Sequence, residues 1–182
     1  MRSIRFPCRL ALPVLLFMLF VPAEFANASG QLMFSGGGAL NSLNGDIAEI
    51  HLPATFMEIS IRGIFDKGKN VVSPFFKLTG VYSELDTTSH KDTKMYGLVP
   101  SFGVNLDLWR FNVYAMAGFG PYTYDEKWSG MADLAVGLDF YVFNWLFLTV
   151  TNHADYMLGF YHLSYRLMGG IGISFGRHTN RW

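Results

Sequence analysis

A strict alternation of apolar and polar residues runs through the last long segment of this chain. Between residues 162 and 175, one face would hold Leu163, Tyr165, Leu167, Gly169, Ile171, Ile173 and Phe175, and the other His162, Ser164, Arg166, Met168, Gly170, Gly172 and Ser174. Side chains of a β-strand point alternately to opposite faces, so a period of two predicts a strand. At about fourteen residues, the segment is longer than the usual strand of a soluble protein. We therefore expect unusually long strands.

The same alternation recurs along the chain and predicts eight strands, at roughly 30–41, 55–65, 73–84, 95–108, 110–123, 131–143, 145–156 and 161–175. The connections after the second, fourth and sixth are tight ("DKGKN", "LWR", "FNW"). The others are mostly longer and more polar, around 42–54, 84–95, 123–130 and 155–161. Alternating short and long connections are typical of an up-and-down barrel with one rim in the periplasm and one at the exterior. The predicted fold is all-β, an eight-stranded antiparallel barrel.

The charged residues of the polar face indicate which side of the barrel wall faces water. This face carries Glu58, Arg62, Lys77, Asp107, Asp133, Asp139 and Arg166. Small residues lie between them, as a narrow eight-stranded lumen requires, and aromatic residues gather near strand ends, as in membrane-interface girdles. We therefore predict a transmembrane barrel, apolar outside, whose lumen holds these seven residues as a polar network. Buried charges must be paired, so such a network would plug the interior.

The first 28 residues predict a cleaved signal peptide. Arg2, Arg5 and Arg9 precede an apolar run, and the small-x-small motif Ala26-Asn27-Ala28 follows it. The run is about 12 residues long, short of the roughly 20 that a membrane-spanning helix needs. Residues 29–182 would then form the barrel domain.

The mature chain would be slightly acidic. Cleavage removes three of the fourteen basic residues and one of the fourteen acidic residues, which leaves eleven basic and thirteen acidic residues and a net charge of −2. Nothing in this balance favours nucleic acid as a partner.

The mature chain would contain no cysteine, because Cys8 lies within the signal peptide. This excludes a disulfide, a thiolate nucleophile and a cysteine-based metal site. Half of the residues are hydrophobic (51%), yet no stretch after the signal approaches 18 uninterrupted apolar residues. The hydrophobicity is therefore distributed over alternating positions.

The second half of the chain resembles a known family. The segments "NVYAMAGFGPYTYDEKWSGMADLAVGLDFYVFNWLFLTV" and "HLSYRLMGGIGISFG" are similar to small bacterial outer-membrane barrels of the OmpA/OmpX and opacity-protein type. The resemblance implies a Gram-negative outer-membrane location, a non-enzymatic envelope or surface role, contact with outer-membrane lipid and lipopolysaccharide, and assembly by the barrel-assembly machinery through the last strand. Family members usually stop at a strand-final aromatic. Here "GRHTNRW" follows Phe175, so the last strand ends at Phe175 or at Trp182.

His162 and Ser164 form a candidate catalytic pair, because residues i and i+2 of a strand share a face. The pair resembles the His-x-Ser of PagL-type lipid A deacylases, which are also eight-stranded outer-membrane barrels. A serine hydrolase needs an acid to orient its base. No Asp or Glu follows Ser164, Tyr165 replaces the family's Asn, and Asp155 is the best remaining acid. The competing interpretation is two polar residues that face the lumen.

Other chemistry is weakly indicated. His153 and Asp155 share a face, but a metal site needs more ligands than that. The glycine-rich "SGGGALNSLNG" lacks the lysine and helix of a phosphate loop. We therefore expect no metal, no cofactor and a monomer.

The leading prediction is a non-enzymatic outer-membrane barrel, with a lipid A hydrolase and a small-solute pore as alternatives. A pore would need a lumen less crowded than Tyr114, Met116, Tyr141 and Arg166 suggest.

Overall fold

The computed structural model describes residues 28–42, 50–65, 71–85, 93–124, 127–158 and 162–175. Its strands are β1 (Ala28–Ser42), β2 (Ile50–Phe65), β3 (Val72–Leu85), β4 (Thr93–Leu108), β5 (Phe111–Tyr124), β6 (Lys127–Phe143), β7 (Leu146–Met157) and β8 (His162–Phe175). All but the last residue of the predicted signal peptide lies outside the described residues, as does the segment from Gly176 to Trp182. Within the described part of the chain, no helix is long and apolar enough to cross a membrane.

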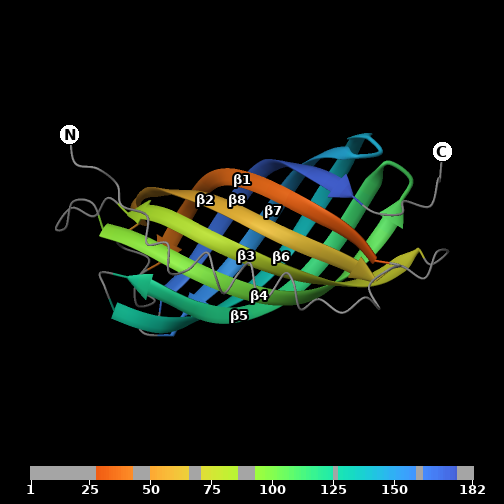
Figure 1. The fold of residues 1–182 in the computed structure, drawn as a ribbon. Helices are drawn as coiled ribbons and strands as arrows, with labels where there is room; N and C mark the ends of the chain where they lie inside the picture. Colours follow the sequence, from red (N-terminus) through yellow and green to blue (C-terminus); the bar gives the residue numbers. More distant parts are fainter. Residues whose placement is uncertain are drawn as a thin grey trace, which may run out of the picture.

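The eight strands form one closed antiparallel barrel in chain order (Figure 1). Each strand pairs with the next, and β1 pairs with β8 through partners such as Leu32 and Ile173. Closure leaves no edge strand, so every strand has hydrogen-bonding partners on both sides. The predicted fold class, all-β with eight antiparallel strands in a barrel, is confirmed.

Several strands extend beyond the apolar alternation that predicted them. β2 starts at Ile50 rather than near residue 55, and β6 starts at Lys127 rather than near residue 131. Tyr124 pairs with Lys127, so the third of the longer connections is only residues 125–126, and the expected loop at 123–130 is wrong. Backbone hydrogen bonds continue a strand without needing apolar side chains, which explains why the pattern placed the starts of these two strands several residues too late.

We name the two ends of the barrel by their connections. The turn end holds the connections after β2, β4 and β6, and the loop end holds those after β1, β3, β5 and β7. At the turn end, Leu108 pairs with Phe111 across a two-residue turn in which Trp109 has a φ of 56°. Phe143 and Trp145 stack with ring centroids 5.9 Å apart. Trp109, Phe143 and Trp145 are all exposed, so this end carries a rim of aromatic side chains.

Glycines make room for three aromatic rings in the lumen near the turn end. Phe75, Tyr114 and Phe147 lie on β3, β5 and β7, and each packs over a glycine of the following strand: Gly103, Gly137 and Gly172. A Cβ atom at any of the three glycines would overlap the ring that it supports. The rings of Phe75 and Tyr114 meet edge to face, with centroids 5.9 Å apart. Because a glycine has no Cβ, these three positions leave the space that the large aromatic rings need in a narrow lumen.

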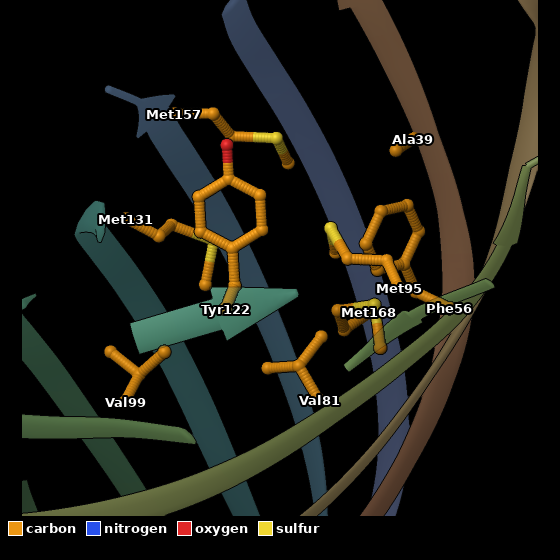
Figure 2. Packing of buried hydrophobic residues seen from close by; sticks show 9 residues of the cluster. All are labelled: Ala39, Phe56, Val81, Met95, Val99, Tyr122, Met131, Met157 and Met168. Carbon is orange, nitrogen blue, oxygen red and sulfur yellow. The ribbon is translucent and has the colours of Figure 1, made fainter. Parts of the chain in front are cut away.

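A second group of buried apolar side chains fills the lumen towards the loop end (Figure 2). We call it the methionine cluster, because Met95, Met131, Met157 and Met168 belong to it. Its other members are Ala39, Phe56, Val81, Val99 and Tyr122. Each of the eight strands therefore contributes at least one buried apolar side chain to this part of the lumen.

Candidate functional site in the barrel lumen

Arg62 is the centre of a polar network in the turn-end half of the lumen. Its guanidinium forms an ion pair with Asp139, and both side chains are fully buried. Its Nε donates a hydrogen bond to Gln31 Oε1 at 2.5 Å, and Gln31 Nε2 donates to the Tyr141 hydroxyl at 2.5 Å. The Asn112 amide lies 3.5 Å from Asp139. This turn-end network joins β1, β2, β5 and β6 across the lumen.

Aromatic rings enclose the same guanidinium. Its central carbon lies 4.6 Å from the Tyr114 ring centroid, 5.4 Å from that of Phe75 and 6.0 Å from that of Phe147. These are the three rings that pack over glycines. The negative face of an aromatic ring attracts a cation, most strongly where water is excluded. Arg62 is therefore held by an ion pair, hydrogen bonds and an aromatic cage together.

Arg166 is the centre of a second network, closer to the loop end. Its guanidinium forms ion pairs with Glu58 and Asp155, and its second bond to Asp155 measures 2.9 Å. His153 Nδ1 lies 3.0 Å from Asp133 Oδ1, and its Nε2 lies 3.8 Å from Glu58 Oε2. This loop-end network joins β2, β6, β7 and β8.

The charges of the two networks nearly balance. Lys77 is also buried, and it interacts electrostatically with Glu58 and Asp133. The described lumen therefore contains four buried carboxylates (Glu58, Asp133, Asp139 and Asp155) and three buried cations (Arg62, Lys77 and Arg166). Asp139 is matched by Arg62. Over the whole described lumen, the buried carboxylates therefore outnumber the buried arginine and lysine side chains by one.

The structure places six of the seven residues expected in the lumen network inside it: Glu58, Arg62, Lys77, Asp133, Asp139 and Arg166 are all buried. Asp107 differs, because it is only half-buried and lies at the turn end, where its backbone N–H donates to the Val71 carbonyl at 2.8 Å. It lies next to the last residue of β4, where the lumen opens towards the rim.

Sequence reasoning missed Gln31, His153 and Asp155 as members of the networks. Thr149, Thr151, His153 and Asp155 share the lumen face of β7, and that alternation was a usable signal. The register was not readable from the sequence. In the structure Asp133 lies directly opposite Asp155, which puts two carboxylates side by side and makes the Arg166 contact necessary.

Ser164 also faces the lumen. It is fully buried, its hydroxyl has no hydrogen-bond partner among the described atoms, and it lies opposite Asp155 in the register of β7 and β8. Both Asp155 oxygens are bonded to Arg166. His162 is the first residue of β8, and its side chain lies outside the described part. The Ser164 hydroxyl therefore points away from the apolar outer surface, where a lipid acyl chain would lie.

Asp133, His153 and Asp155 also form the one group among the described residues with the composition of a cation site. One possible ligand atom from each lies within 4.8 Å of the others. Arg166, however, already bonds both Asp155 oxygens. The Arg166 guanidinium supplies the cation that these carboxylates need, and the set of ligands is better explained as an ionic network.

Neither a scan of protein-family models nor a search of curated proteins finds a match. Solved structures do match. Neisserial surface protein A (NspA) has a TM-score of 0.61 and 15% identity, over 81% of this chain and 99% of NspA. The attachment invasion locus protein Ail of Yersinia pestis has a TM-score of 0.57 and 10% identity, over 81% of this chain and 99% of Ail.

The outer-membrane enzyme PagL is also among the matches, with a TM-score of 0.47 and 12% identity, over 77% of this chain and 97% of PagL. At these identities the similarity concerns the fold. The matches to NspA and Ail, together with the barrel closure and the outward apolar face, show that this chain has the fold of the small eight-stranded bacterial outer-membrane barrels.

Proposed function

We propose that this chain is a non-enzymatic integral outer-membrane protein that supports the cell envelope and presents its loop end to the exterior. The observation that carries the proposal is the sorting of side chains by the barrel wall. Large apolar residues such as Phe102, Leu134 and Leu167 are exposed outside, while seven charged residues are buried inside, where the two arginines form ion pairs with carboxylates. An exposed apolar surface all around a barrel suits lipid as its solvent.

The filled lumen supports a structural role over transport. The methionine cluster and the two ionic networks together fill much of the described lumen of an eight-stranded barrel, a size that side chains can fill completely. Passage of a solute would require breaking buried ion pairs, each of which leaves an unpaired charge. We therefore propose that the barrel does not conduct.

Export, assembly and contacts follow from the same proposal. Cleavage after Ala28 would deliver the chain to the periplasm, and β8 would carry the signal for the barrel-assembly machinery. The wall would contact outer-membrane lipid and lipopolysaccharide as a monomer. Ail offers support from its own case, since it has been solved in a phospholipid bilayer nanodisc and in complex with the heparin analogue sucrose octasulfate.

The test combines location, processing and conductance. The full chain is expressed in a Gram-negative host, and membranes are separated by density. We expect the protein in the outer-membrane fraction, with Ser29 as its N-terminal residue by mass spectrometry. In planar bilayers, we expect no single-channel steps from the purified protein. Steady conductance steps would instead support a pore, and recovery in the inner membrane or the soluble fraction would contradict the location.

Lipid A from the same cells tests the hydrolase alternative. Spectra from cells with the wild-type chain, with Ser164→Ala and with no insert should be identical, because Ser164 faces the lumen. Loss of one acyl chain in the wild-type sample alone would make this protein an esterase.

A further inference from the structure

We propose that the methionine cluster is a binding site for one soft monovalent cation of the Cu(I) class, with Met95, Met131 and Met157 as thioether ligands. Thioethers are soft ligands, and sites that contain them select Cu(I) among the biological metals. The proposal concerns a ligand site in the lumen and is independent of whether the barrel has another role in the envelope.

The first argument is where the chain uses methionine. Of the seven methionines within the strands, six are buried in the lumen, and Met57 alone lies on the outer face, 58% exposed. Leucine shows the opposite distribution, since no leucine whose burial the structure describes is buried. Leucine and methionine have similar volumes and replace each other in cores at low cost. The described part of the lumen therefore gathers thioether side chains at positions where leucine would have filled a similar volume.

The second argument is that the three methionine side chains belong to one buried cluster. Met131 and Met157 are direct partners in the register of β6 and β7, which places their Cβ atoms about 5 Å apart. The Met131 methyl group reaches β4, where it lies 3.7 Å from the position that a Cβ at Gly97 would occupy. Gly97 follows Met95 by two residues on the same face. Figure 2 shows Met95, Met131 and Met157 pointing into the same cluster as the Tyr122 ring.

The third argument is charge. The thioether ligands are neutral, so a bound cation needs a counter-charge nearby. Met131 and Met157 are two residues from Asp133 and Asp155 on the same faces of their strands. These carboxylates belong to the loop-end network, and the buried carboxylates of the described lumen outnumber its buried arginine and lysine side chains by one, an excess of one negative charge. One monovalent cation in the methionine cluster would neutralise it, whereas a divalent ion would leave an excess positive charge.

Silver titration of the full-length protein purified in detergent tests the proposal. Ag(I) is a redox-stable probe of Cu(I) sites, and chloride-free buffer keeps it in solution. We expect wild-type protein to bind a single Ag(I), measured by calorimetry and native mass spectrometry. The variant Met95→Leu/Met131→Leu/Met157→Leu should lose this binding, because leucine keeps the volume and removes the sulfur. Met57→Leu is the matched control and should bind as wild type does.

A second measurement keeps the test decisive if the triple variant does not fold. Methyl-labelled methionine gives one NMR signal for each side chain of the wild-type protein. Addition of Ag(I) should shift the signals of Met95, Met131 and Met157 and leave that of Met57 in place. Absence of Ag(I) binding by wild-type protein, or equal binding by a folded triple variant, would show that these methionines only fill space. A shift confined to Met57 would overturn the proposal in the same way.

Discussion

At the scale of single residues, the lumen is organised around buried arginines. Arg62 combines an ion pair with Asp139, a hydrogen bond to Gln31 and three aromatic rings. A buried guanidinium is costly to desolvate, so the stability of the fold depends on the partners that compensate its charge. The sequence placed Arg62 and Asp139 on the polar face, but it could not pair them. They lie on β2 and β6, and only the closed barrel brings those strands across from each other.

Replacing Arg62 tests how far the turn-end network depends on it. Arg62→Leu leaves Asp139 buried without a cation, and we expect the free energy of unfolding to fall by about 3–5 kcal/mol. Urea unfolding of the barrel in lipid vesicles measures this. The double variant Arg62→Leu/Asp139→Leu removes both charges and should recover part of the loss. A double variant less stable than the single variant would contradict the pairing.

Gly137 tests the space that the Tyr114 ring needs. A Cβ there would overlap that ring, so Gly137→Ala should destabilise the barrel by about 1–3 kcal/mol through displacement of a packed side chain. Gly169→Ala is the matched control, since a Cβ at Gly169 meets nothing within 4 Å on the outer face. Equal effects of the two substitutions, in the same unfolding measurement, would show that ring packing is not the cause.

At the scale of elements, the strands were predictable and their ends and register were not. The alternation of apolar and polar residues predicted all eight strands, because one face of each strand forms the apolar outer wall and the other faces the polar lumen. It failed at Ile50 and Lys127, where backbone pairing continues beyond the apolar pattern. It also left Asp155 outside the lumen network, because the contact of β7 with β6 depends on which residues lie opposite each other.

Truncation tests where the closing strand ends. β8 as described ends at Phe175, whose neighbour across the seam is Gly30. Removing residues 176–182 should therefore leave a folded barrel, seen as the usual shift in electrophoretic mobility between unheated and heated samples. Removing residues 170–182 takes away the β8 partners of Gly30 through Ser35 and should abolish the folded band. Loss of the folded band in the shorter truncation would place the functional end of the strand at Trp182.

At the scale of the whole molecule, the barrel reverses the usual arrangement of a protein, with its ionic groups inside and its apolar groups outside. The alternation alone could not show this, because soluble and membrane barrels share a period of two. The charged residues of the polar face decided the orientation. What they could not decide is the lumen's internal order, in which two ionic networks lie beside the methionine cluster that Figure 2 shows.

A charge on the outer wall tests the membrane environment directly. Leu134 lies near the middle of β6 and is 63% exposed. If lipid surrounds it, Leu134→Arg should cost about 2–4 kcal/mol, while Leu108→Arg, at the turn end of β4, should cost about 0–1 kcal/mol. Unfolding in vesicles measures both. Similar, negligible costs for the two substitutions would mean that water, not lipid, surrounds the wall.

The seam between β1 and β8 is built like every other seam of the barrel, with antiparallel pairs from Gly30 and Phe175 to Ser42 and Leu163. The chain therefore has no structurally privileged starting strand. A circular permutant that joins residues 175 and 28 by a short linker, and opens the backbone between Trp109 and Arg110, would keep the same eight strand pairings. Its pairing therefore does not distinguish β8 from the other strands. Besides the assembly signal that we propose for it, β8 differs in being the last strand to be made, so the ring cannot close before it.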